Sequence, residues 1–219
     1  MLKTNNLLDL EHTIAKDYLN SFEFPWQALG GIKNEIIRLG ETLNPDEYDH
    51  PQEHIWIHKE ATVAPTAYIG SPCIIGKGTQ VRHCAFIRGS ALIGENCVVG
   101  NSVELKNVIL FDNVQVPHYN YVGDSILGYK AHMGAGSITS NVKQDKSLIT
   151  IKTGSERIKT DLKKFGAIVG DYCEIGCNAV LNPGTVMGRR SRAYPLTSVR
   201  GFILENRIFK GGTTLINIR

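Results

Sequence analysis

Large apolar residues recur at every sixth position over much of this 219-residue chain. The first run consists of Ile57, Val63, Ile69, Ile75, Val81, Ile87, Ile93, Val99, Leu105 and Phe111. Four places after each of the first eight stands a residue that is usually small: Ala61, Ala67, Cys73, Thr79, Ala85, Ala91, Cys97 and Val103. A period of six, in which one short strand and one tight corner are completed, is typical of a parallel β-helix. Because three such sides close one coil, we expect residues eighteen apart to lie above one another.

This register is interrupted over one short distance. Pro117 stands where the next apolar residue belongs, and the pattern resumes at Tyr121, Leu127 and Met133. After a longer gap it continues through Val169, Ile175, Leu181, Met187, Ala193 and Val199. The pattern therefore predicts an all-β solenoid of about six coils over residues 51–210. It also predicts a four-residue break at 117–120 that contains His118.

The segments outside the repeat are expected to have different structures. Residues 1–50 have apolar positions at helical spacing, and they are predicted to form a cap over the open end of the coil. Residues 140–166 leave the repeat, and 148–152 could pair with 157–161 as a hairpin. Residues 211–219 are expected to be a C-terminal tail.

The overall composition indicates a globular protein of the cytoplasm. Hydrophobic residues make up 42% and charged residues 21% of the chain. No apolar run reaches the length of a membrane span, and the N-terminus is too polar for a signal peptide, so we expect no membrane partner. The five cysteines lack CxxC spacing, and Cys73, Cys97 and Cys173 occupy inward positions of the repeat. We expect these three to be reduced packing residues.

Positive charge is concentrated in two places, although the net charge is only +3. Residues 140–166 contain seven lysines and arginines against three carboxylates, and Arg189, Arg190 and Arg192 form a second cluster. Two interpretations remain open: solvated surface, or a site for a small phosphorylated ligand. Nucleic acid is disfavoured as a partner because aromatic residues are not interleaved with these charges.

One corner of the coil carries two unusual residues. The position after the apolar residue is Gly at 70, 76, 94 and 100, but it is Arg88 and Lys106 in two sides that lie one coil apart. Two like charges at such short distance repel unless an anion lies between them. We therefore favour a phosphate site here over two side chains that only extend into water.

His118 is the candidate catalytic residue. A neutral imidazole can accept a proton from an attacking amine or hydroxyl, and Glu104 is the candidate carboxylate that would fix its tautomer. The alternative is a structural histidine. A metal site is not expected: His50, His54 and His58 have helical spacing, but Pro51 and the strand-like residues 55–57 argue against a helix there.

Three stretches make the chain resemble a known family. They begin at Val103 (Val-Glu-Leu-Lys-Asn-Val), at Pro117 (Pro-His-Tyr-Asn-Tyr-Val-Gly-Asp) and at Met133 (Met-Gly-Ala-Gly-Ser-Ile-Thr-Ser-Asn). They resemble the acetyltransferase domain of the bifunctional N-acetylglucosamine-1-phosphate uridylyltransferase/glucosamine-1-phosphate acetyltransferases. The archaeal sugar-1-phosphate nucleotidylyltransferase/amino-sugar acetyltransferases look closer still, and the likeness covers about residues 55–210.

The resemblance implies a left-handed β-helix, a homotrimer with sites between subunits, and N-acetylation of an amino-sugar phosphate by acetyl-CoA in the biosynthesis of UDP-N-acetylglucosamine. His118 would be the general base and Glu104 its partner. The sugar phosphate would be held by Arg88, Lys106 and Tyr121, and coenzyme A by Ala135, Cys177 and Lys210.

The sequence departs from the family pattern at several positions. His132 stands where the family has an asparagine that contacts the sugar, Cys177 replaces a serine, and a substrate-binding lysine falls at or beside Lys146. Residues 1–50 are too few for a nucleotidyltransferase domain, and Gly30-Gly31 opens no phosphate loop. Two other functions therefore stay open: a non-catalytic trimeric scaffold or sugar-nucleotide-binding module, and a zinc-dependent lyase of the carbonic anhydrase type.

Overall fold

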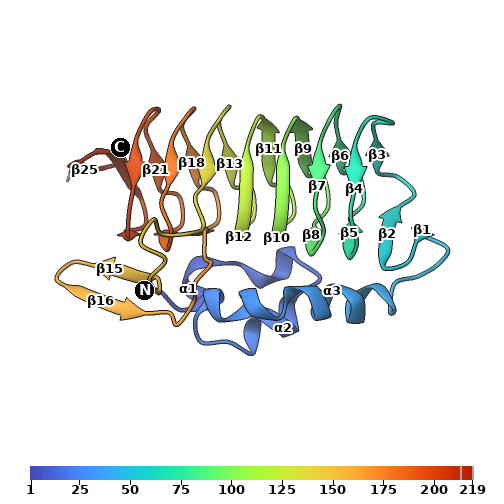
Figure 1. Cartoon of the computed structure of the whole chain (residues 1–219), viewed down its shortest axis with the longest axis horizontal. Coiled ribbons are helices and arrows are strands. Elements are labelled where there is room, and N and C mark those ends of the chain that lie inside the picture. Colours follow the sequence, from blue (N-terminus) through green and yellow to red (C-terminus); the bar gives the residue numbers. More distant parts are fainter. Residues whose placement is uncertain (213, 219) are drawn as a thin grey trace.

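The computed structural model describes residues 1–212 and 214–218, which form a β-solenoid of about nine turns with short N-terminal helices (Figure 1). Parallel strands stack into three faces. Face 1 contains β2 (Ile55–His58), β5 (Cys73–Ile75), β8 (Ala91–Ile93), β17 (Ala167–Val169), β20 (Thr185–Met187) and β23 (Phe202–Ile203). Face 2 contains β3 (Thr62–Val63), β6 (Gln80–Val81), β9 (Val98–Asn101), β11 (Gln115–His118), β13 (His132–Met133), β18 (Glu174–Ile175), β21 (Arg192–Ala193) and β24 (Arg207–Gly211).

Face 3 is joined to face 1 through two long strands. Its short strands are β4 (Tyr68–Ile69), β7 (Phe86–Ile87), β14 (Ile138–Thr139), β19 (Val180–Leu181) and β22 (Ser198–Val199). Between β7 and β14, the strands β10 (Glu104–Leu110) and β12 (Tyr121–Leu127) begin on face 3 and continue round the corner onto face 1.

The repeating apolar residues fill the interior as predicted. Ile75, Val81 and Ile87, one from each side of a coil, are at most 1% exposed. The cysteines predicted to be inward packing residues are also buried: Cys73, Cys97 and Cys173. Burial raises the pKa of each of these three thiols to about 12, so that they remain protonated at neutral pH.

The change of register takes a different form from the predicted break at 117–120. Ile87 pairs with Leu105, eighteen residues on, but Leu92 pairs with Ile109, only seventeen residues on. One residue is therefore missing at the corner that contains Asn107. The next coil is shortened in the same way at Asp124, and both residues have left-handed backbone angles (φ of 54° and 48°). Asn and Asp tolerate this conformation better than other non-glycine residues.

The predicted four-residue break was therefore wrong. Leu110, not Phe111, takes the position above Ile93, and Val116 continues the regular stacking above Val99. His118 consequently ends an ordinary strand, β11, and does not lie in an irregular loop.

The N-terminal segment lies along one side of the solenoid. It contains α1 (Thr4–Leu7), η1 (Leu10–His12), α2 (Lys16–Asn20), η2 (Pro25–Gly30) and α3 (Ile32–Gly40). Here α3 packs on β5, β8 and β10, and η2 packs on β12, so that the segment covers face 1 (Figure 1). We call residues 1–43 the N-terminal cover. The predicted helices are present, but their expected position over the open end was wrong.

An apolar stripe on the outside of face 1 explains this position. Its outward residues are at most 7% exposed: Trp56, Ile74, Leu92, Ile109, Ile126, Ile168 and Val186. Strands that are buried on both sides have continuous apolar runs, whereas half-exposed strands alternate. The strands of face 1 have such runs, as in Ala91-Leu92-Ile93, and they therefore require a cover.

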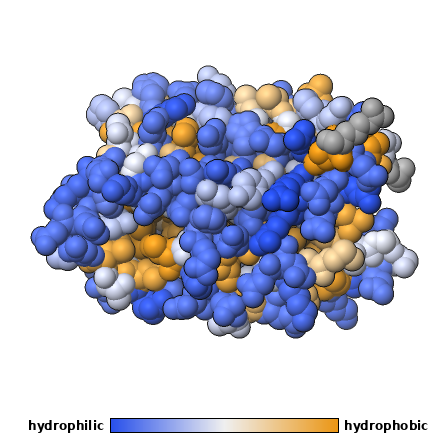
Figure 2. All heavy atoms as spheres, turned by 180° about the vertical axis from the view of Figure 1, so that it is seen from behind, coloured by the Kyte–Doolittle hydropathy of each residue, from blue (hydrophilic) through white to orange (hydrophobic). Residues whose placement is uncertain are grey.

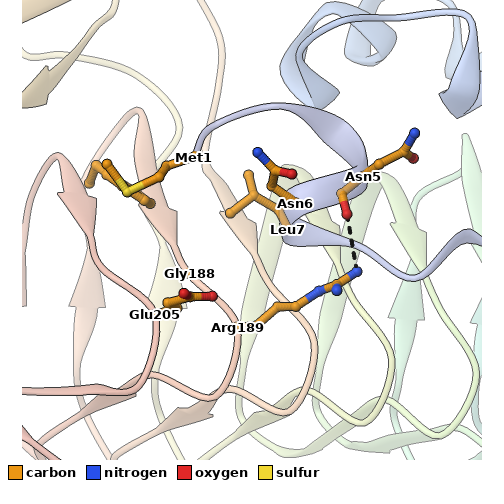
Figure 3. Close-up of a pocket in the computed structure, with 8 residues that line it drawn as sticks. Met1, Asn5, Asn6, Leu7, Gly188, Arg189 and Glu205 are labelled. Atoms are coloured by element: carbon orange, nitrogen blue, oxygen red, sulfur yellow. Dashed lines mark hydrogen bonds between the residues drawn. The ribbon is translucent and has the colours of Figure 1, made fainter.

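Contacts also fix the N-terminal cover to late coils. The backbone amide of Asp9 donates to Asp171 Oδ2 at 2.8 Å, and Arg189 Nη2 donates to Asn5 O at 3.4 Å (Figure 3). The cover therefore holds early and late coils together, since Asp171 and Arg189 belong to the last third of the chain.

The excursion contains the predicted hairpin. Strand β15 (Thr150–Thr153) pairs antiparallel with β16 (Glu156–Lys159), with Lys152 opposite Arg157. Ile149 and Ile151 are fully buried, and β15 packs beside β23 at the corner between faces 3 and 1. The hairpin therefore extends the cover of face 1, while most of its lysines stay exposed.

An antiparallel strand covers one strand edge at each end of the solenoid. Strand β1 (Tyr48–Gln52) pairs with β2, and β25 (Thr214–Asn217) pairs with β24, which protects edges that would otherwise invite association. Residues 214–217 are thus a strand, and the expected tail was wrong there. The expected six coils were also too few, because the hexad count omitted the inward residues Val116, Thr139, Ile203 and Phe209.

In the described part of the chain, no helix is both long and apolar enough to cross a membrane. The surface seen from behind is mostly hydrophilic, with several separate hydrophobic patches (Figure 2).

Candidate functional site

Three of the predicted site residues lie on one edge of the solenoid, the corner between faces 2 and 3. His118, Ala135 and Cys177 occupy this corner in three successive coils. His118 O accepts from Gly136 N at 3.0 Å, and Ala135 O accepts from Asn178 N at 2.8 Å. Each coil adds about 4.8 Å, so His118 and Cys177 are about 10 Å apart along the edge. We call this corner the ridge.

The ridge is smooth next to His118 and continues to Lys210. Gly134, Gly136 and Gly176 flank Ala135 and Cys177, so that no bulky side chain stands between His118 and the exposed Cys177 thiol. Two coils further on, Lys210 Nζ lies 4.9 Å from the centre of the Tyr194 ring. The ridge thus leads from an exposed imidazole, past backbone and small side chains, to a cation.

A buried amide holds the backbone on which His118 stands. Asn120 is 2% exposed, and its Oδ1 accepts from the backbone amide of His118 at 3.1 Å. Its Nδ2 donates to Gly134 O at 2.8 Å and to Ser137 O at 3.1 Å. Because these contacts join two neighbouring coils, Asn120 fixes the turn while the His118 side chain stays exposed. Asn120 is not among the residues predicted for the site.

Arg88, Glu104 and Tyr121 form a group on face 3, beside the ridge. Glu104 pairs with Tyr121 in register, and Arg88 Nη1 donates to Glu104 Oε1 at 2.8 Å. No hydrogen bond joins Glu104 to His118 within residues 1–212 and 214–218. The carboxylate expected to fix the imidazole tautomer is therefore engaged by Arg88 in the single chain.

Lys106 follows Arg88 by one coil, as predicted, but it also has a carboxylate partner. Lys106 Nζ lies 3.0 Å from Asp124 Oδ1, and the Asp124 side chain is almost completely buried. The two cations expected to share an anion are thus each neutralised within the chain, by Glu104 and Asp124. An anion that binds here would therefore contact cations, Arg88 and Lys106, that already have the carboxylates of Glu104 and Asp124 beside them.

Tyr121 lies between these charges as a hydroxyl donor. Burial raises the pKa of its phenol, and the nearby carboxylates of Asp124 and Glu104 raise it further. The phenol therefore stays protonated at neutral pH. Gly123 provides the space for the ring, since a Cβ at Gly123 would lie 2.7 Å from Tyr121 Cζ.

Two predicted substrate residues lie elsewhere in the chain. His132 is on face 2, where its Nδ1 lies 2.8 Å from Glu174 Oε2. Lys146 is exposed in a turn of the excursion, where its backbone amide donates to Lys143 O at 3.1 Å. Neither contacts Arg88, Lys106 or Tyr121 in the part of the chain that the structure describes.

Two pockets of the single chain contain no predicted site residue, whereas a third, of about 460 Å³ on face 2, is lined by His132. One of about 310 Å³ lies between Met1, Asn5 and Leu7 of the N-terminal cover and Arg189 of a late coil (Figure 3). Another of about 340 Å³ lies beside the excursion and is lined by Lys143 and Arg200. Among the described residues, no group of three or more His, Cys, Asp or Glu side chains could hold a metal ion.

Comparison with known proteins identifies the relatives of this fold. No protein-family model matches the chain. The bifunctional protein GlmU of Methanococcus aeolicus is 31% identical over 209 residues, which cover 87% of this chain and 46% of that protein. The bifunctional sugar-1-phosphate nucleotidylyltransferase/acetyltransferase of Sulfurisphaera tokodaii is 29% identical over 184 residues, covering 84% of this chain and 43% of that protein.

The chain is homologous to the hexapeptide-repeat acetyltransferase region of these bifunctional proteins. It spans less than half of their length. Among solved structures, a mutant of the N-acyltransferase AntD from Bacillus cereus, in complex with dTDP and coenzyme A, is similar with a TM-score of 0.41 and 13% identity. That similarity covers 79% of this chain and 90% of that one.

Proposed function

We propose that this GlmU-like chain is an acetyl-CoA-dependent N-acetyltransferase that acts on an amino-sugar phosphate. The observation that supports this most is the meeting of the ridge with the Arg88–Glu104–Tyr121 group at one corner. His118 ends β11 on face 2, and Tyr121 begins β12 on face 3, only three residues later. A donor bound along the ridge and an acceptor bound on face 3 would therefore meet beside the imidazole.

The ridge fits coenzyme A in shape and charge. The glycines and Ala135 admit the narrow pantetheine arm close to the backbone, and Lys210 supplies a cation for a phosphate group about four coils, or 19 Å, from His118. Acetyl-CoA would thus place its thioester beside the imidazole and its phosphates at the far end of the ridge.

The residues on face 3 fit an acceptor that carries both an amine and a phosphate. Arg88 and Lys106 would bind the phosphate, and the Tyr121 hydroxyl would donate to it or to a sugar oxygen. In the reaction, the neutral amine attacks the thioester carbonyl carbon, the C–S bond breaks, and coenzyme A leaves. His118 would take the proton released from the amine nitrogen and return it to the leaving thiolate. Orientation and proton transfer are sufficient, and no protein nucleophile is required.

We further propose that the active form is a homotrimer with sites between subunits. Face 3 bears exposed aromatic residues in line with the acceptor group: Tyr68 is 61% and Phe86 43% exposed. A second copy that packs on this face would bury them and enclose the open site. It could also supply His132 and Lys146, which lie away from Arg88 within one chain.

Release of coenzyme A tests the proposed reaction. Purified protein is incubated with acetyl-CoA and glucosamine 1-phosphate, or with other amino-sugar phosphates, and free thiol is measured. We expect thiol release that requires the acceptor and yields its N-acetylated product. If none of the acceptors supports release, the chain is instead a binding or scaffold module, a role compatible with the internal pairing of Arg88 and Lys106.

Cysteine labelling tests where coenzyme A lies. We expect iodoacetamide to alkylate Cys84 and Cys177 in the folded protein, because only these two of the five thiols are exposed. Saturating coenzyme A, with iodoacetamide in large excess so that the coenzyme A thiol does not deplete it, should slow alkylation of Cys177 at least fivefold. Cys84 is an internal control, since it lies on the same corner but on the other side of His118 from Cys177. Peptide mass spectrometry measures both rates, and equal rates with and without coenzyme A at Cys177 would rule out the proposed path.

A further inference from the structure

Asp124 differs from Asp171, the other buried aspartate among the described residues, in what its carboxylate binds. Within residues 1–212 and 214–218, its side chain takes no hydrogen bond from a backbone amide. It accepts from Lys106 Nζ at 3.0 and 3.1 Å, from Asn107 Nδ2 at 3.0 Å and from Asn141 Nδ2 at 2.5 Å. At 4% exposure, Asp124 is therefore a buried charge that is neutralised and hydrogen-bonded entirely by side chains.

Asp171 shows what a purely structural aspartate does in this fold. It is 1% exposed, and it accepts from the backbone amides of Asp9 at 2.8 Å and Tyr129 at 2.9 Å, besides an ion pair with Arg189 Nε at 2.9 Å. Its carboxylate thereby fixes the N-terminal cover to a late corner. Among the described residues Asp124 makes no such backbone contact, and one of its partners, Asn141, also contacts Tyr121 of the group on face 3.

The partners of Asp124 reach the acceptor group through two routes. Lys106 is one of the two cations proposed to bind the phosphate, and Asp124 is its ion-pair partner. Asn141 Nδ2, which donates to Asp124, also lies 3.2 Å from the Tyr121 hydroxyl. One carboxylate thus determines the positions of a cation and, through Asn141, of a phenol.

The same carboxylate is linked to the N-terminal cover. Asn107 Nδ2, which donates to Asp124, also donates to the backbone oxygen of Leu29 at 3.1 Å. The arrangement depends on the two shortened corners, because they place Asn107 and Asp124 one coil apart in left-handed conformations. The helical cover therefore supports the site from behind.

We infer that Asp124 is a positioning residue for the acceptor: it holds Lys106 and, through Asn141, Tyr121 in the arrangement that binds the amino-sugar phosphate. This role rests on the proposed function, and it concerns the acceptor only, because the side-chain partners of Asp124 in the described part of the chain, Lys106, Asn107 and Asn141, lie outside the ridge. A buried ion pair adds little net stability, because the cost of desolvating both charges offsets their attraction. A positioning role gives the Lys106–Asp124 pair a reason that stability does not.

The test compares Asp124→Asn with Asp171→Asn, the same substitution at a similarly buried corner residue. In Asp124→Asn an amide nitrogen would face at least one of three donors, so we expect the KM for the amino-sugar phosphate to rise at least tenfold. The KM for acetyl-CoA should change less than twofold. Asp171→Asn should lower the Tm and leave both KM values within twofold of the wild type.

A milder variant keeps the test valid if Asp124→Asn does not fold. Asn107→Gly removes one donor to Asp124 and the link to Leu29, while glycine accommodates the positive φ. We expect a two- to fivefold rise in the acceptor KM alone.

Three outcomes would overturn the inference. The first is an unchanged acceptor KM in Asp124→Asn or, if that variant does not fold, in Asn107→Gly. If the wild type is active, this result overturns the role of Asp124 and leaves the proposed function standing. An equal rise of both KM values, or the same acceptor effect in Asp171→Asn, would show a merely structural role. A wild type that is inactive on every acceptor would refute the proposed function, and the role of Asp124 would fail with it.

Discussion

Replacing His118 by alanine is expected to lower kcat for acetyl transfer by about 10²- to 10⁴-fold, the usual range for loss of a general acid–base residue. The Tm should stay within about 2 °C of the wild type. The His118 side chain is exposed, so its removal should leave the free energy of unfolding almost unchanged. The backbone of the corner is held by Asn120, not by the imidazole. Steady-state kinetics with saturating acetyl-CoA and acceptor measure the loss.

His83→Ala is the matched control for this prediction. His83 is also exposed and lies on the same corner two coils earlier, where it contacts Thr66 and Cys84. We expect its kcat to remain within twofold of the wild type. An equal loss of kcat in His83→Ala and His118→Ala, or full activity in His118→Ala, would show that another group transfers the proton.

Replacing Leu92 by alanine is expected to lower the free energy of unfolding by about 2–5 kcal/mol, the range for a buried leucine that leaves a cavity. Leu92 points outward from face 1, yet it is 1% exposed because α3 packs over β8. Chemical denaturation with an unchanged m-value measures the difference.

Val98→Ala is the control within the same coil. Val98 points outward from face 2, which has no helical cover, and it is only half-buried. We expect a loss below about 1 kcal/mol, since little apolar surface is removed from water at that position. Similar losses at both positions would contradict the account of face 1 as a second, outward core beneath the N-terminal cover.

The sequence period predicts the architecture well because hexads report directly on packing. Ile75, Val81 and Ile87 point inward, and the hairpin of the excursion follows from its turn residues. The position of the N-terminal cover was predicted wrongly, although the signal is present: the residue before each inward position of face 1 is apolar, as in Ile74 and Leu92. A pattern that considers only the one inward residue of each hexad does not include this second, outward apolar stripe.

The site was predictable in part. The residues on the ridge align because stacking follows from the period, and Arg88 and Lys106 do lie one coil apart. Their partners were not predictable, since the pairing of Lys106 with Asp124 depends on two corners that are each one residue short. Asn107 and Asp124 are seventeen residues apart, and this spacing is the sequence signal for the two shortened corners. The change of register was instead predicted as a four-residue break that contains His118.

A crystal structure with coenzyme A and glucosamine 1-phosphate bound tests the central claim most directly, because the claim is that two binding paths meet at His118. We predict coenzyme A along the ridge, with its sulfur next to His118, its pantetheine arm past Ala135 and Cys177, and its phosphates toward Lys210. The sugar phosphate should contact Arg88 and Tyr121 on face 3. Coenzyme A bound away from the ridge, or a sugar amine out of reach of the His118 imidazole, would contradict the account.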